Sequence, residues 1–353
     1  MPLIINLRKI GFLWIIFNVT ACECFPLPAD QCSRNKLVGS CGVPKNRAPI
    51  EFYDTASIVR NSRSNQHEPE FTAQLPPVPH LVVLLPAYNE VQRIGDTIET
   101  YQSDLDNSNQ WMEKAQILVV DDGSEDGTSD FVQSRKTEGK AHVDCISLLH
   151  NKGKGAAISF GIDYLATKYG ERACLVLIAD ADGSGDISCM DKMVMSLGHL
   201  IASQSLSEET FWHVPALVVG NRGYKGSSLS RSVLRWGFRT TVRLLCGDLR
   251  VSDSQCGFKL LTLAAAKRLY ADLSLKRWSH DVEVLYRARE WSMPITEESV
   301  GWQDKDGSKL ITSPFGAVQV SSIMLLEVLQ MRIEYATKRK NFPSDKDKIS
   351  NIP

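Results

Sequence analysis

Short apolar runs alternate with helix-length segments along most of this 353-residue chain, and that alternation constrains its fold more than any other feature. The runs have the length of β-strands and carry no regular polar positions, as strands do when both faces are buried. Strands of this kind, separated by helices, predict an α/β fold with a mainly parallel central sheet and helices on both faces. The expected strands are 81–85, 117–120, 143–148, 174–179 and 216–220, and the expected helices include 90–105, 126–137 and 154–168.

Composition divides the chain into segments and excludes one class of partner. The formal net charge is −1, whereas domains that bind nucleic acid are normally distinctly basic, so no nucleic-acid partner is expected. The basic and apolar segment 1–25 resembles a signal peptide or a signal-anchor, and the charges flanking it leave its orientation open. The other expected segments are a linker or extension at 26–79, a folded domain at 80–340 and a polar tail at 341–353.

Acidic residues gather where two of the expected strands end. Asp121 and Asp122 close one strand, and Asp180, Asp182 and Asp186 follow another. Because ligands bind at the carboxyl ends of the strands in such sheets, both groups are expected at one rim. Asp180 and Asp182 are two positions apart, which places both carboxylates on one side of an extended chain, where they suit Mg²⁺ or Mn²⁺ bound to a diphosphate. The alternatives are a turn with a helix cap for the first group and a solvated acidic loop for the second.

A family resemblance covers residues 80 to about 336. The chain carries, in the family's order and spacing, the motifs LVVLLPAYNE, VVDDGSEDGT, NKGKGAA, ADADG, SQCGFKL, RWSHDVEVLY and GSKL. Together these resemble the family 2 glycosyltransferases, and the later, more specific motifs are most similar to the eukaryotic dolichyl-phosphate β-glucosyltransferases. The resemblance implies a GT-A fold, Mg²⁺ or Mn²⁺ as cofactor, and inverting transfer of glucose from UDP-glucose to dolichyl phosphate. The expected product is dolichyl β-D-glucosyl phosphate, used for protein N-glycosylation.

The same resemblance gives expected roles to individual positions. The residues expected to hold the uridine are Pro86, Tyr88, Glu90 and Asp122. Those expected to bind the metal and the diphosphate are Asp180 and Asp182. Those expected to line the sugar and acceptor region are Gln255, Lys259, Asp281 and Glu283, with Lys309 on a loop over the phosphates. Arg222 and Arg231 match basic positions of the family and are expected at the acceptor phosphate. Lys154 lies at the glycine-rich beginning of an expected helix, where an anion can bind.

The chemistry of the expected acceptor bears on the role of Asp281. A phosphate monoester has a second pKa near ~6, so it is largely dianionic and already nucleophilic at neutral pH. Such an acceptor needs positioning and charge neutralisation more than deprotonation, so orienting the substrates is as good a role for Asp281 as general-base catalysis. His280 and Ser279 stand where the family usually has Phe and Ala. His280 is either a buried histidine with no catalytic role or a residue that tunes the neighbouring acid.

Two segments suggest a membrane surface as a partner. SRSVLRWGFRTTVRLL repeats arginine every four residues, which on a helix gives one stripe that either is solvated or meets lipid headgroups. Residues 317–336 are mostly apolar but carry three charges, as in an interfacial helix or one packed on the core. The cysteines of the folded domain are scattered singly, which favours a reducing, cytosol-facing compartment. The expected location is the endoplasmic reticulum membrane, with the catalytic domain facing the cytosol.

Two other functions remain open at this point. One is the mannosyl counterpart that uses GDP-mannose, although such enzymes usually have Gln where this chain has Ser184. The other is a catalytically inactive scaffold that binds a nucleotide sugar. Because the chain keeps both aspartates, Gln255, Asp281 and Lys309, the sequence favours an active glucosyltransferase.

Overall fold

The computed structural model of this protein describes residues 80–337 apart from 136–140, 205–206, 224–228 and 304–313. The side chains of 229–235 and 314–318, which lie within helices, are also not described. The expectations for 1–25, 26–79, 341–353 and Lys309 therefore fall outside the described residues.

Within the described residues, the chain forms a seven-stranded sheet with the order β3-β2-β1-β4-β6-β5-β7. The strands are β1 (His80–Ala87), β2 (Ala115–Asp121), β3 (His142–Ser147), β4 (Cys174–Ile178), β5 (Leu217–Asn221), β6 (Lys259–Thr262) and β7 (Ile295–Ser299). Neighbouring strands run parallel except at β6, which is antiparallel to both β4 and β5. The expected α/β class with a mainly parallel sheet is confirmed.

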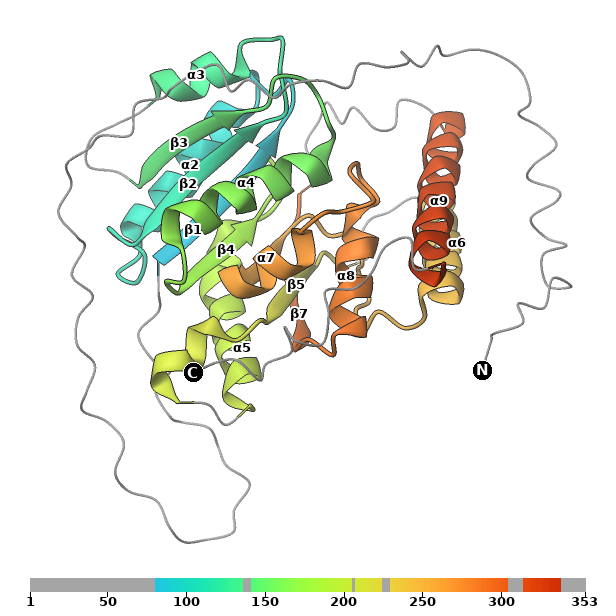
Figure 1. The fold of residues 1–353 in the computed structure, drawn as a ribbon. Coiled ribbons are helices and arrows are strands. Elements are labelled where there is room, and N and C mark those ends of the chain that lie inside the picture. The colour runs from blue at the N-terminus through green and yellow to red at the C-terminus, as the bar shows by residue number, and fades with distance from the viewer. Residues whose placement is uncertain (1–79, 136–140, 205–206, 224–228, 304–313, 338–353) are drawn as a thin grey trace, which may run out of the picture. The chain divides into compact units, whose positions relative to one another are not determined.

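Helices cover the sheet on both faces, with α4 and α7 across the near face in Figure 1 and α2 behind the strands. The helices are α2 (Ile94–Asn107), α3 (Thr128–Ser134), α4 (Lys154–Tyr169), α5 (Met190–Ala202), α6 (Leu229–Cys246), α7 (Leu263–Tyr270), α8 (His280–Glu290) and α9 (Pro314–Ala336). Gly161 lets α4 lie directly on the sheet, because a Cβ there would stand 2.8 Å from the side chains of Leu84 and Val120. Both of those side chains are completely buried.

The reversed direction of β6 decides which residues reach the rim of the sheet. Parallel strands bring their carboxyl ends to that rim, but an antiparallel strand brings its amino end. Lys259, the first residue of β6, pairs with Ile178, the last residue of β4. The SQCGFKL motif therefore lies beside the ADADG motif, although the apolar pattern alone predicts neither β6 nor the edge strand β7.

Helices α6 and α9 lie side by side next to α8 (Figure 1). One side of α9 is packed into the protein through Val328, Met331 and Tyr335, while Ile323 and Ile333 are about half exposed. Segment 317–336 therefore combines features of both alternatives, an interfacial helix and a helix packed on the core. One side of it packs on the core, and another side presents apolar side chains outward. Among the helices of the described residues, none is both long enough and apolar enough to cross a membrane.

A tight turn after β2 depends on Gly123. Its φ is +71°, in the left-handed region that favours glycine. A Cβ at Gly123 would lie 2.7 to 2.9 Å from backbone atoms of His150 and Asn151. The turn therefore needs glycine both for its backbone conformation and for the close approach of the 150–151 segment.

Gly123→Ala is expected to destabilise the protein more than Gly127→Ala does. Gly127 also has a positive φ, +86°, but no atom lies within 4 Å of its Cβ position. Both variants carry the left-handed strain of about 1 kcal/mol, and only Gly123→Ala adds an overlap with backbone, costing about 2 kcal/mol more. Urea denaturation of both variants measures the difference, and equal losses would show that the contact with 150–151 is unimportant.

Candidate active site

The carboxylate of Asp180 follows β4 and meets the ammonium of Lys154, the first residue of α4. Burial by itself lowers the pKa of Lys154, but the carboxylates of Asp180 and Asp281 outweigh it and raise that pKa above its ordinary value. Lys154 is therefore a fixed positive charge at neutral pH. Gly257 makes room on the other side, because a Cβ there would lie 2.6 Å from both carboxylate oxygens of Asp180.

Asp182 is connected to the loop that follows β1. Its Oδ1 accepts a hydrogen bond of 3.0 Å from the backbone N–H of Ser184. Its Oδ2 lies 3.7 Å from Nη1 of Arg93, and Arg93 donates two further bonds of 2.6 and 2.7 Å to Glu90. Arg93 therefore joins a residue expected at the uridine to one expected at the metal. Sequence reasoning missed Arg93, although its position three residues after Glu90 at a helix start was a usable signal.

Asp281 is buried in a cluster of cationic and polar groups at the start of α8. Its Oδ1 lies 2.7 Å from Nζ of Lys259 and 3.2 Å from Nε2 of His280. Burial by itself would raise the pKa of Asp281, but His280, Lys259 and Lys154 hold that pKa below its ordinary value. Asp281 is therefore ionised at physiological pH and is a weak base.

His280 is buried, and it also contacts the carboxylate of Asp281. It is 1% exposed, and its Nδ1 donates to the carbonyl of Arg277 at 2.7 Å. Burial, reinforced by Lys154 and Lys259, lowers the pKa of His280 despite the attraction of Asp281. The first turn of α4 approaches so closely that a Cβ at Gly155 would lie 2.7 Å from Cβ of His280. This contact explains why the NKGKGAA motif has glycine at position 155.

Arg222 follows β5 and is held in place by Asp253. Its Nε and Nη2 donate to the two oxygens of that carboxylate at 2.7 and 2.8 Å, and its guanidinium lies 5.2 Å from the ring centroid of Trp302. The backbone N–H of Asp253 is bound in turn by Glu297 of β7 at 2.9 Å. Among the described residues, Nη1 of Arg222 has no recorded hydrogen bond, so its N–H groups remain for a ligand.

Comparison with known proteins identifies the family. The sequence matches the family described as Glycosyl transferase family 2 over residues 82–200. It is 34% identical over 278 residues to dolichyl-phosphate beta-glucosyltransferase of Mus musculus, covering 74% of this chain and 77% of that protein. The proteins with the same name from Dictyostelium discoideum and Saccharomyces cerevisiae are 32% and 30% identical, each covering 72% of this chain and 75% of the relative. The chain belongs to glycosyltransferase family 2.

In this glycosyltransferase the residues expected at the uridine lie around the ends of β1 and β2. Pro86 is in β1, and Tyr88 just beyond it is 37% exposed. Asp122 is 3% exposed, and its two oxygens accept from the backbone N–H groups of Lys152 and Gly153, both at 2.8 Å. Burial raises the pKa of Asp122 despite these bonds. Asp122 thus fixes the turn that leads into α4.

The structure places Glu283 differently from the sequence expectation. Its carboxylate is fully buried and accepts four hydrogen bonds rather than facing the rim. The donors are the backbone N–H groups of Ser274 and Leu275, the guanidinium of Arg287 and the hydroxyl of Tyr335, at 3.1, 2.7, 2.8 and 2.9 Å. Glu283 therefore holds the 274–275 loop and α9 against α8. A residue saturated in this way positions the site and does not touch a substrate.

For the remaining residues, the structure gives a position in the fold but no contact with a substrate. Gln255 is half-buried in the loop before β6, two residues from the glycine that contacts Asp180. Arg231 lies in α6, but its side chain is not described. Asp186 accepts from the backbone N–H of Ser188 at 2.9 Å and caps the short helix Ile187–Cys189.

The donor set at the rim fits a divalent metal that binds together with a substrate. Asp180 and Asp182 supply carboxylate oxygens, the ligands that Mg²⁺ and Mn²⁺ prefer, and the side chain of each is about a quarter exposed. Within the part of the chain that the structure describes, no cluster of three or more His, Cys, Asp or Glu residues forms a complete metal site. Oxygens of a bound diphosphate would have to complete the coordination.

Glu283→Gln is expected to lower the free energy of unfolding by about 3 kcal/mol or more, because it leaves buried Arg287 without its charged partner. Glu290→Gln is the matched control, since Glu290 lies at the end of the same helix with a side chain that is 35% exposed. Urea denaturation of both variants measures the effect. Equal stability of Glu283→Gln and Glu290→Gln would contradict the positioning role.

Proposed function

We propose that this glycosyltransferase moves glucose from UDP-glucose to dolichyl phosphate, with inversion at the anomeric carbon. The product is dolichyl β-D-glucosyl phosphate for protein N-glycosylation. The relatives that carry this name are 30 to 34% identical to the chain over about three quarters of its length. The observation in the structure that supports the proposal most strongly is the ion pair between Asp281 and Lys259. A paired, weakly basic carboxylate suits an acceptor that needs no deprotonation.

On the donor side, Asp180 and Asp182 would hold Mg²⁺ or Mn²⁺. The ion supplies charge neutralisation for the diphosphate that leaves with the uridine. Lys154 adds a permanent positive charge beside Asp180, and its pKa keeps it protonated across the physiological range. Charges fixed before the reaction stabilise a developing anion without reorganisation. Tyr88, exposed at the end of β1, suits the base and ribose of the nucleotide.

On the acceptor side, the lipid phosphate attacks the anomeric carbon directly. The phosphate oxygen forms the new bond while the bond to the diphosphate breaks, and one such displacement inverts the configuration. Arg222 would receive the acceptor phosphate through Nη1, because Asp253 fixes the other edge of its guanidinium. Asp281 keeps Lys259 and His280 in place at the rim and orients the substrates.

A membrane surface as partner is supported by the exposed apolar residues of α6 and α9. Trp236 and Leu244 of α6 are 70% and 81% exposed, and they are accompanied on α9 by Ile323, Leu326 and Ile333. The two helices lie side by side (Figure 1). Apolar side chains on adjacent helices, with arginines nearby, suit the interface of a bilayer that holds the lipid acceptor. The proposed location is the cytosolic face of the endoplasmic reticulum membrane.

Asp180→Asn and Asp182→Asn are each expected to reduce transfer roughly a hundredfold, since each removes a charged ligand at the developing diphosphate. Asp186→Asn is the control, because Asp186 caps a short helix and is not one of the expected metal ligands. The assay gives membranes dolichyl phosphate with labelled UDP-glucose or labelled GDP-mannose, with and without Mn²⁺.

Transfer from UDP-glucose that depends on Mn²⁺ or Mg²⁺ is the expected result. Transfer from GDP-mannose alone would establish the mannosyl function instead. Binding of UDP without turnover of either sugar nucleotide would establish the inactive scaffold.

Asp281→Asn is expected to lower the transfer rate, because it leaves buried Lys259 without its charged partner, but to leave the acid limb of the pH–rate profile unchanged. That limb should fall near ~6, where the acceptor phosphate loses its second proton. The profile of the purified wild type and variant with dolichyl phosphate provides the measurement. Disappearance of the acid limb in Asp281→Asn would show that Asp281 is a general base after all.

A further inference from the structure

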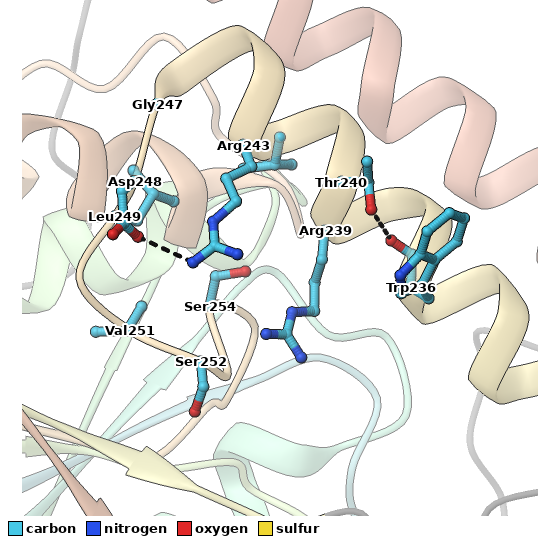
Figure 2. Close-up of a pocket in the computed structure, with 11 residues that line it drawn as sticks. Trp236, Arg239, Thr240, Arg243, Gly247, Asp248, Leu249, Val251, Ser252 and Ser254 are labelled. Carbon is cyan, nitrogen blue, oxygen red and sulfur yellow. Dashed lines mark hydrogen bonds and ion pairs between the residues drawn. The ribbon is translucent and has the colours of Figure 1, made fainter.

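A pocket of about 190 Å³ lies between α6 and the segment 247–254. Figure 2 shows that the guanidinium groups of Arg239 and Arg243 point from α6 toward this segment. Val242, Leu249 and Val251 contribute apolar walls, and Trp236 lies at one end. Arg222, the residue expected at the acceptor phosphate, does not line the pocket.

The charge of the pocket is positive. Arg239 and Arg243 are one turn apart on α6, so their side chains lie on the same face of the helix. Arg243 pairs with Asp248 at 3.4 Å, and both side chains of that pair are about two-thirds exposed. Such an exposed pair is weak in water and yields readily to a stronger anion. The charged residues that line the pocket are two arginines and one aspartate, so the lining itself carries a net positive charge.

Ser254 adds a hydrogen-bond donor inside the pocket. It is 6% exposed and lines the pocket, and among the described residues its hydroxyl has no recorded hydrogen bond. Figure 2 shows its oxygen directed toward the guanidinium of Arg243. Ser252 differs, because its hydroxyl donates to Glu297 at 2.7 Å and accepts from Asn221 at 2.8 Å. The hydroxyl of Ser254 can therefore donate a hydrogen bond to an oxygen of a ligand in the pocket.

We propose that this pocket binds a phosphate group. Arg239 and Arg243 offer planar N–H donors that match phosphate oxygens, and Ser254 donates a third hydrogen bond. The phosphate belongs either to a lipid headgroup or to a small soluble phosphate. Trp236 and Leu244, both largely exposed on the same helix, favour the headgroup, since they would lie against the bilayer beside it.

The pocket and the expected acceptor region share one short segment of the chain. Ser254 is adjacent in sequence to Asp253, which fixes Arg222 through two hydrogen bonds. A phosphate bound to Ser254 orders the segment that carries Asp253. This consequence depends on the proposed function, whereas phosphate binding itself does not, so the two fail separately.

The test measures binding directly on the full chain, without any sugar donor. The probes are inorganic phosphate, soluble dihexanoyl phosphatidic acid, and phosphatidylcholine vesicles with or without phosphatidic acid. The variants are Arg239→Gln, Arg243→Gln and Ser254→Ala, and thermal unfolding confirms that each is folded. Arg250→Gln is the matched control, because Arg250 is an exposed arginine of the same segment that does not line the pocket.

Each arginine variant is expected to weaken binding roughly tenfold, as the loss of a charged hydrogen bond does. Arg243→Lys should fall between wild type and Arg243→Gln, because it keeps the charge but loses the planar pair of donors. Binding of inorganic phosphate that depends on the arginines supports a small phosphate ligand. Binding of phosphatidic acid that depends on them while inorganic phosphate does not compete supports a headgroup. Binding that is unchanged in both arginine variants, or equally weakened by Arg250→Gln, overturns the proposal.

Discussion

The buried ion pair between Lys259 and Asp281 is the interaction on which the rest of the site depends. Lys259 and the side chain of Asp281 are almost completely excluded from solvent, so neither charge would be tolerated without the other. Lys259 also donates to the carbonyl of Cys256, and His280 supports Asp281 from the side. Lys259 begins β6 opposite the end of β4, so this pair connects helix α8 to the strand beside the one that leads to Asp180.

The other charged groups of the site repeat that arrangement. Most of the expected acidic residues have a cation beside them, as Asp180 has Lys154, whereas Asp122 is bound by backbone N–H groups. The expected acceptor arginine, Arg222, has Asp253. Arg93 likewise pairs with carboxylates from two loops, because it contacts both Glu90 and Asp182. A site with fixed and balanced charges is suited to moving a glycosyl group to an anionic acceptor, where stabilising charge matters more than moving protons.

Local sequence was sufficient for five of the seven strands and for the acidic rim. Continuous apolar runs followed by Asp180 and Asp182 can be interpreted without knowing what they contact, because burial and strand ends are properties of neighbouring residues. The antiparallel β6, the bridge made by Arg93 and the support of Arg222 by Asp253 depend on partners that lie far away in the sequence. Glu283 also shows what local sequence leaves out. Its motif suggests a place in the site, but its four hydrogen-bond donors hold it in the interior.

Binding of Mn²⁺ to the full chain, followed by electron paramagnetic resonance, tests the central claim most directly. The claim is that two carboxylates at the rim, balanced by fixed cations, bind a metal only together with a nucleotide diphosphate. The account predicts weak binding of Mn²⁺ alone, tight binding in the presence of UDP, and loss of that enhancement in Asp180→Asn. Tight binding without UDP, or an undiminished enhancement in Asp180→Asn, would contradict it.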